Sequence, residues 1–344
     1  MIASYERGMT AAPHALGESP AWRAVAAGPV VAAITLVTAL IVTSEAGVPL
    51  RDPNGVSLRR FVITAAVVAV LVGLDIAFRD GRRRWTTARA LTAAGALVSF
   101  YVTYLAYRNL KSVVPLLRPE ALFDRRLADL DRSLFAGSDP AALLHDLLGS
   151  GVSAQGLSVA YEGFFVFIPV AIAFALVVMP DLRGGLFLTT ALAINWALAA
   201  ASYFLLPALG PIYAEPTAFS QLPVTGVSRL QEALLDQRLE FLRDPSAGGS
   251  AQSIGAFASL HVSIVFTAAV ATHLLGLGRY VKIGVWVLFA LTVAATVYFG
   301  WHYVLDDLAG LAIAVTALAL ARALTGIDLR SARQRLPAPS PAEA

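Results

Sequence analysis

The sequence predicts an all-helical protein that crosses a membrane several times. Of its 344 residues, 57% are hydrophobic and only 14% are charged, and the mean hydropathy is +0.69. A soluble protein needs more charge than this to cover its surface. Apolar runs of about 20 residues, the length of helix that crosses the ~30 Å hydrocarbon core of a bilayer, recur along the chain. Together these observations define an all-α polytopic membrane protein.

Eight segments are long and apolar enough to be expected membrane spans. They lie at roughly 24–43, 61–78, 88–107, 158–178, 185–206, 258–276, 283–300 and 303–321. Residues 1–22, which precede the first span, hold charges, prolines and glycines without an apolar run, so we expect a mobile tail. Residues 323–344 are basic and rich in proline, which blocks helix propagation. We expect them to form a cytoplasmic tail that does not pack.

The connecting segments indicate the orientation in the membrane. Arginines cluster around the second and third expected spans, and these are Arg79, Arg82, Arg83, Arg84 and Arg89. Cytoplasmic segments carry an excess of basic residues, so this cluster is expected inside. Alternation then makes both termini cytoplasmic and places 108–157, 207–257 and the turn at 300–302 on the extracytoplasmic side. We expect an integral protein of the plasma membrane, and its net charge of +3 requires no nucleic acid partner.

The two long extracytoplasmic segments are expected to contain surface helices. Residues 119–148 space leucines among charges, and these are Leu122, Leu127, Leu130, Leu134 and Leu143. This pattern is typical of short amphipathic helices that lie on a bilayer surface. A second such piece is expected at 227–242.

Two histidines and a carboxylate stand at the ends of apolar spans, where ionisable groups are functional by default. His302 and Asp306 are four residues apart at the start of the last span, so they share a helix face. A carboxylate there fixes the imidazole tautomer and leaves the other ring nitrogen free as a nucleophile or base. The alternative is an interfacial histidine beside an aspartate that favours the helix dipole. The neighbouring Asp307 can equally serve as the cap.

His261, two residues after Ser259, opens the sixth expected span on the same side of the membrane as His302. Two imidazoles on one surface predict phosphoryl transfer by a nucleophile and a general acid, the acid contributing about 10²–10⁴-fold. A metal site built from both histidines, Asp306 and Asp307 is the competing interpretation, but this spacing matches no known metal motif. The chain also has no cysteine. Any metal would therefore need histidine and carboxylate ligands only, and we expect neither a metal nor a cofactor.

A pair of basic residues ends the third span. Lys111 and Arg118 are seven residues apart, so they return to one helix face. Fixed cations stabilise the negative charge that phosphate oxygens gain in the transition state. The alternative is that this pair anchors the span to lipid headgroups. Basic anchors favour the cytoplasmic side, however, and this pair is expected on the other.

Three segments in order resemble motifs of the type 2 phosphatidic acid phosphatase (PAP2) superfamily. The stretch from Lys111 to Pro119 is similar to its first motif, K-x₆-R-P, and Ser259-Leu260-His261 to its second. His302 with Asp306 is similar to its third. The resemblance covers residues 88–322 as a six-helix catalytic core and leaves residues 23–87 as two additional N-terminal transmembrane helices.

Two departures from the family pattern indicate which branch of the superfamily the chain resembles and which phosphate ester it would use. A serine and an arginine usually precede the histidine of the third motif, but Ala295 and Thr296 occupy their places, so one phosphate-binding arginine is missing. The second motif is more often P-S-G-H, and its S-L-H form is similar to the inositol phosphorylceramide synthase branch, as are residues 130–135 and 203–211. A phosphodiester carries one negative charge where a phosphomonoester approaches two. A site with fewer cations therefore suits the diester.

The resemblance implies a phosphohistidine mechanism. His302 would attack phosphorus, Asp306 would orient it, and His261 would protonate the departing lipid alcohol. The residues assigned to phosphate binding are Lys111, Arg118 and Ser259. The implied partners are a lipid phosphate or phosphodiester donor, a lipid or water acceptor, and the membrane. We expect transfer of a phosphorylated headgroup, inositol phosphate by this resemblance, or lipid phosphate hydrolysis when water is the acceptor.

Polar residues within the expected spans include Glu162, Asn195 and Tyr203. Each is a candidate for a headgroup pocket, while a buried polar contact between helices explains each equally well. Two rival classes remain. A CDP-alcohol phosphotransferase resembles residues 306–310 superficially but needs a longer aspartate array. A transporter, the non-enzyme alternative, does not explain why three motifs converge on one surface.

Overall fold

The computed structural model describes residues 21–78, 85–179, 181–247, 249 and 251–328. All regular structure in these ranges is helical, and strands are absent from them. Seven of the helices are long and apolar enough to cross a membrane. The predicted all-α polytopic class is confirmed. The two tails expected at 1–22 and 323–344, and the arginines at 79–84, lie wholly or largely outside the described residues.

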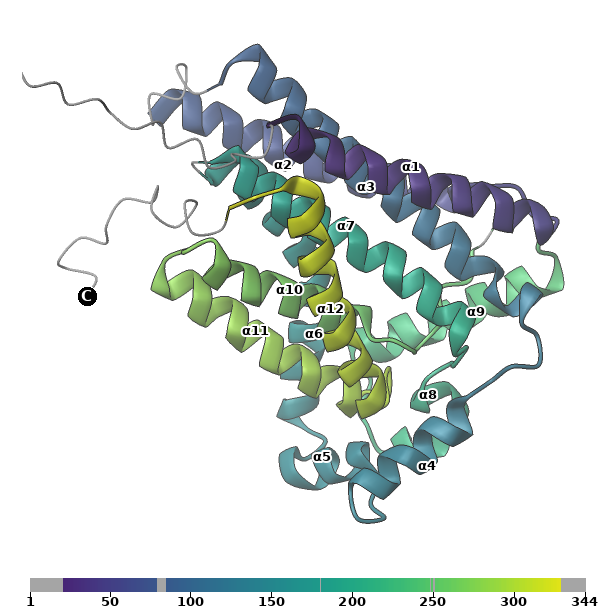
Figure 1. Ribbon diagram of the computed structural model, residues 1–344. Coiled ribbons are helices and arrows are strands. Elements are labelled where there is room, and N and C mark those ends of the chain that lie inside the picture. Colours follow the sequence, from purple (N-terminus) through teal and green to yellow (C-terminus); the bar gives the residue numbers. More distant parts are fainter. Residues whose placement is uncertain (1–20, 79–84, 180, 248, 250, 329–344) are drawn as a thin grey trace, which may run out of the picture.

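The seven long helices form a bundle (Figure 1). They are α1 (Ala21–Glu45), α2 (Val56–Phe78), α3 (Thr87–Leu117), α6 (Val152–Ala173), α7 (Leu182–Leu205), α11 (Arg279–Tyr298) and α12 (Val304–Thr325). A π-helical turn, Phe174–Val178, extends α6. Among the seven, α7 is the most enclosed and α2 the least.

The expected sixth span is shorter than predicted. Its helix, α10, runs over Leu260–Leu274, and 15 residues reach only about 22 Å. The apolar run that predicted a span at 258–276 is helical only in part, because Ser259 caps the helix and the chain turns after Leu274. Since α10 packs against α7, α11 and α12, it needs no full bilayer length of its own. The division into six core spans plus two is therefore not confirmed.

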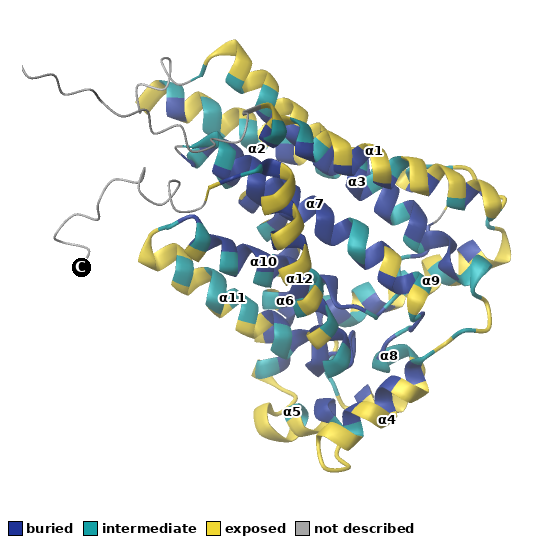
Figure 2. Ribbon diagram, viewed as in Figure 1, coloured by how far each residue is buried: buried dark blue, intermediate teal, exposed yellow. Residues whose placement is uncertain are grey.

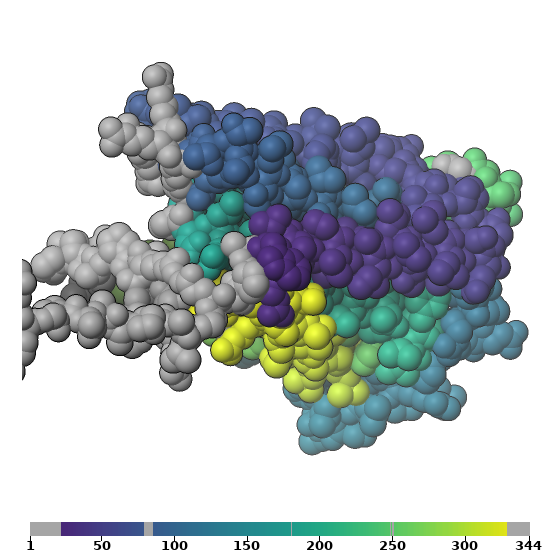
Figure 3. Space-filling view, turned by 45° about the horizontal axis from the view of Figure 1, so that its top comes forward, coloured from purple at the N-terminus to yellow at the C-terminus, as the bar shows by residue number. Residues whose placement is uncertain are grey.

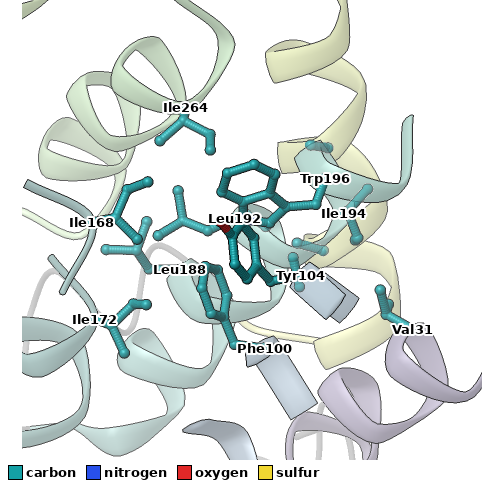
Figure 4. Close-up of a cluster of buried hydrophobic side chains, with 14 of the residues drawn as sticks. Val31, Phe100, Tyr104, Ile168, Ile172, Leu188, Leu192, Ile194, Trp196 and Ile264 are labelled. Atoms are coloured by element: carbon teal, nitrogen blue, oxygen red, sulfur yellow. The ribbon is translucent and has the colours of Figure 1, made fainter. Parts of the chain in front are cut away.

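The core of the bundle surrounds α7, which is dark blue along most of its length in Figure 2. Bulky side chains of α3, α6, α7 and α10 interlock there, as Figure 4 shows for Phe100, Ile168, Leu192, Trp196 and Ile264. The first helix, α1, packs across α3 and α7 and reaches α12 (Figure 3). Arg23 of α1 donates to the carbonyl of Ala323 at the far end of α12.

Short helices cover the end of the bundle at which α12 begins (Figure 1). They are α4 (Asp124–Leu134), α5 (Pro140–Leu148), α8 (Pro211–Ala214), α9 (Gly226–Arg243) and the 3₁₀ turn Pro216–Phe219, while a further 3₁₀ turn, Pro53–Gly55, precedes α2. The helices expected at 119–148 and 227–242 are thus present. Each is amphipathic: Leu127 of α4 is buried, whereas Leu134 is exposed.

A close approach of two backbones holds α7 against the end of α6. A β-carbon on Gly185 would lie 2.0 Å from the carbonyl oxygen of Ala175, so Gly185→Ala forces the helices apart. We expect a loss of about 1–3 kcal/mol or more of stability, the usual cost of overpacking. Thermal unfolding in detergent micelles measures it.

The matched control is Gly284→Ala on α11, where no heavy atom lies within 4 Å of the new methyl group. Its unfolding temperature should stay level or rise, because alanine is the better helix former by up to about 1 kcal/mol. Equal effects of the two substitutions would contradict the close approach.

Candidate active site

His302 is placed by the turn between α11 and α12. After α11 ends at Tyr298, the backbone N–H groups of Trp301 and His302 donate to the carbonyl of Thr296, at 2.9 and 3.2 Å. The chain thereby folds back and enters α12 at Val304. The side chain of His302 is buried directly before the first turn of that helix.

Asp306 holds the backbone at this point, and its carboxylate lies beside the imidazole. Its Oδ2 accepts a hydrogen bond from the backbone N–H of Tyr303 at 2.9 Å and lies 3.5 Å from Nδ1 of His302. The carboxylate is fully buried. With Nδ1 directed toward the carboxylate, Nε2 is the ring nitrogen left for chemistry.

His261 lies beside His302, as the sequence predicted. It occupies the first turn of α10, and the two ring centroids are 5.8 Å apart. Its imidazole packs between aromatic rings of α6, with Phe164 at 4.4 Å and Tyr161 at 4.7 Å. A histidine held in this way has a fixed orientation toward its neighbour.

Both histidines line a cavity of about 290 Å³, together with Lys111 of α3. The Lys111 side chain extends past Gly255, where a β-carbon would lie 2.9 Å from its Cε. Its Nζ lies 4.4 Å from the ring centroid of Tyr203. Within the described part of the chain, Lys111 has no carboxylate in ion-pair contact. The cavity therefore presents an uncompensated cation beside two imidazoles.

Two residues expected to bind phosphate lie outside this cavity. Helix α3 ends at Leu117, before Pro119, so Arg118 leaves the face it would share with Lys111. Its guanidinium donates to the carbonyl of Phe204 and lines a neighbouring cavity of about 40 Å³. The hydroxyl of Ser259 is buried and caps α10 by accepting from Val262 N at 3.5 Å. Ser259 acts here on the helix and does not line the cavity.

The three headgroup candidates have different surroundings. Tyr203 lines the cavity. Asn195 is fully buried away from it, where it joins α7 to α10 by hydrogen bonds with Ser263 and Thr267. Glu162 is exposed, and its carboxylate lies against Gly226 at the start of α9. Neither Asn195 nor Glu162 lines the cavity, contrary to the expectation of a headgroup pocket. Hydrogen bonds to α10 occupy the amide group of Asn195, and the carboxylate of Glu162 points to the start of α9.

Sequence reasoning missed two carboxylates of α4 that hold the site from outside. Asp131 accepts from the N–H groups of Val304 and Leu305, at 2.7 and 3.1 Å, and so caps α12 from another helix. Asp124 accepts from the N–H groups of Leu209 and Gly210, at 3.0 and 2.8 Å. The signal was present, since both Asp131 and residues 209–210 belong to the segments 130–135 and 203–211 singled out above.

The residues around the substituted positions of the third motif form a buried polar contact. Thr296, which stands where the family has arginine, donates from its hydroxyl to Oδ2 of Asp307 at 3.1 Å. Asp307 does not line the cavity. No group of three or more histidine, aspartate or glutamate side chains among the described residues is arranged to hold a metal ion.

The electrostatics favour a neutral imidazole at the entrance to α12. Burial lowers the pKa of His302 to about 3, and the nearby charge of Lys111 acts in the same direction. A depressed pKa means that the ring is unprotonated at any pH above about 4. An unprotonated imidazole is the form that can attack an electrophile.

These features define a membrane enzyme that acts at a polar site within a helical bundle. The model of the PAP2 superfamily matches residues 125–320, which is more than half of the chain. The protein belongs to the PAP2 superfamily. Membership supports a phosphatase-type or phosphotransferase-type activity on a lipid phosphate. No match was found among curated proteins or among solved structures.

The capping of α12 by α4 generates a prediction for Asp131. Asp131→Ala leaves two N–H groups without an acceptor beside His302, which costs about 0.5–2 kcal/mol for a helix cap. We expect kcat to fall at least tenfold while KM changes less than threefold, because His302 is displaced but the cavity is not. Asp131→Asn keeps one acceptor oxygen and should recover part of kcat.

Asp129→Ala is the control for this experiment, because Asp129 is an exposed residue of the same helix. It should leave both constants unchanged. A loss in Asp131→Ala that appears in KM alone, or no recovery by asparagine, would argue against the positioning role.

The depressed pKa of His302 generates a second prediction. In ¹⁵N-histidine-labelled protein, the ring signals of His302, assigned by their disappearance in His302→Asn, should stay those of a neutral imidazole from pH 8 to pH 5. A ring that begins to protonate near pH 6.5 would show that burial does not control its charge.

Proposed function

We propose that the protein is a membrane-embedded phosphotransferase that moves inositol phosphate from a donor lipid to an alcohol acceptor through a phosphohistidine at His302. The observation that carries this proposal is the meeting of His302, His261 and Lys111 at one cavity of about 290 Å³, although they come from three different parts of the chain. Nucleophile, acid and cation are the three groups that a phosphohistidine mechanism uses.

The proposed reaction has two displacements at phosphorus. Nε2 of His302 attacks, the bond from phosphorus to the donor's glycerol oxygen breaks, and His261 gives its proton to that oxygen. The acceptor hydroxyl then loses its proton to His261 and attacks phosphorus, and the bond to His302 breaks. Asp306 orients the imidazole through both steps, and the Lys111 ammonium offsets the charge on the phosphate oxygens.

The charge near the histidines supports a phosphodiester as the donor. Thr296 replaces an arginine of the family pattern, and Arg118 bonds to a carbonyl in a side cavity. Lys111 is then the cation beside the imidazoles, in a cavity that Arg60 and Arg108 also line. One cation beside the reacting phosphate matches the single charge of a diester better than the two of a monoester.

An adjoining apolar pocket supports a lipid as the substrate. It has a volume of about 80 Å³, lies between α2, α3 and α6, and shares Tyr104, Phe165 and Trp196 with the main cavity. A hydrocarbon chain can enter this apolar pocket from the bilayer without being exposed to water, an exposure that would cost about 0.8 kcal/mol for each CH₂ group. We further propose, from the positive-inside rule, that this end of the bundle faces the extracytoplasmic side.

The test supplies purified protein with phosphatidylinositol labelled at phosphorus and a long-chain lipid alcohol. We expect the label to appear on the second lipid and, after rapid quenching, as an acid-labile phosphoprotein. His302→Ala should abolish both, with turnover reduced more than about 10³-fold. Label released only as a soluble phosphate would support the lipid phosphate phosphatase, in which water is the acceptor.

His273→Ala is the matched control, because His273 lies at the other end of α10 and accepts a hydrogen bond from Trp286 Nε1 there. It should keep both turnover and the phosphoprotein. Unchanged turnover in His302→Ala would refute the proposed mechanism.

A further inference from the structure

Arg60, a residue of α2, lines the cavity from a helix that lies outside the matched family region. Its guanidinium packs over the rings of Tyr104 and Phe165, with Cζ 5.3 and 5.2 Å from their centroids. Its Nη1 donates to the hydroxyl of Tyr104. The arginine is therefore directed into the bundle. A charged side chain is costly there, so its presence indicates a functional role.

Anchoring to lipid headgroups does not explain this orientation. The preceding residue, Arg59, is exposed on the outer face of α2 and is free to reach the headgroup layer. Arg60 instead lines both the main cavity and the adjoining apolar pocket, beside the rings of Tyr104 and Phe165. Two adjacent arginines on one helix thus have different environments, and only the second faces the substrate cavity.

The charges that line the cavity are not balanced. Arg108 also lines it, but its guanidinium is paired with Asp52 at 2.7 Å. Arg60 and Lys111 have no carboxylate partner within the described ranges. Guanidinium has five N–H donors, and the Tyr104 hydroxyl takes up one of those of Arg60. The cavity thus holds two uncompensated cations.

These two cations occupy separate parts of the cavity. Lys111 is beside the histidines, whereas Arg60 packs on the ring of Phe165, whose centroid is 6.4 Å from that of His261. Arg60 also lines the apolar pocket between α2, α3 and α6. It therefore stands where the polar cavity meets the pocket proposed for hydrocarbon. The polar group of an amphiphile reaches this boundary when its chain enters the pocket.

The geometry points to Arg60 as the binding residue for a second phosphate group, one that is not transferred. This inference rests on the proposed function, in which Lys111 binds the reacting phosphate. Arginine is suited to the task, because its planar fork binds phosphate oxygens by two parallel hydrogen bonds. The second phosphate belongs either to the headgroup of the donor or to the acceptor lipid. Helix α2 would then determine which substrates the enzyme accepts.

Alkane bisphosphonates of increasing spacer length test the inference directly. Their affinity is measured by calorimetry on the full-length protein in detergent and compared with that of monophosphonates of the same length. At the best spacer length we expect the bisphosphonate to bind at least tenfold tighter, because Lys111 and Arg60 each hold one end. Arg60→Gln should remove this preference and leave monophosphonate affinity within twofold.

The variants separate this inference from the proposed function. Arg59→Gln, the matched control, should keep the bisphosphonate preference, and Arg60→Lys should keep part of it. Lys111→Gln should weaken both classes of ligand. Equal affinity of the two classes in the unaltered protein, or a preference that survives in Arg60→Gln, would overturn the role of Arg60. Loss of monophosphonate binding in Lys111→Gln would still support the proposed phosphate site.

Turnover distinguishes the two sources of the second phosphate. If the donor carries it, phosphatidylinositol phosphate should have a lower KM than phosphatidylinositol, and Arg60→Gln should equalise the two. If the acceptor carries it, a phosphorylated lipid alcohol should have the lower KM, with the same loss in the variant. An Arg60→Gln protein that discriminates among both sets of substrates as the unaltered protein does would refute the inference.

Discussion

The start of α12 is the point on which the site depends. The first N–H groups of a helix have no partner within it, and inside a membrane protein little water is present to satisfy them. Here carboxylates supply the acceptors: Asp306 binds the N–H of Tyr303, and Asp131 binds those of Val304 and Leu305. Because His302 directly precedes these residues, the same hydrogen bonds that begin the helix also hold the backbone from which its imidazole projects. The carboxylates that cap α12 therefore also determine where His302 lies.

The sequence was sufficient to predict the class of fold and the residues that meet. Hydropathy identifies a helical membrane protein because backbone groups in lipid must pair within their own segment. Motif spacing identified His261, His302, Asp306 and Lys111, which line or adjoin one cavity. It was misleading for Arg118, because the shared face assumed a helix that in fact ends at Leu117.

Other features depend on contacts between distant segments, which no local pattern specifies. All faces of α7 are enclosed, so periodicity cannot tell a cavity-lining Tyr203 from a structural Asn195. The caps supplied by Asp131, and the inward direction of Arg60, follow from how α4 and α2 pack. The expected span at 258–276 likewise failed because hydropathy counts apolar residues without registering where a helix begins. The sequence shows that Thr296 replaces an arginine of the family pattern, but only the structure shows that its hydroxyl contacts the buried Asp307.

The short length of α10 has a consequence for the interior of the bundle. Residues 252–258 precede it as irregular backbone, held by the carbonyl of Lys111, the hydroxyl of Ser202 and the carbonyl of Ala208. A helix continued through this stretch would have a diameter of about 10 Å and would fill the space between α3 and α7. An extended chain is thinner, and the volume it leaves unfilled adjoins both imidazoles. The cavity beside the imidazoles, which Ser253, Ile254 and Gly255 of this stretch also line, is thus left open by a helix that starts late.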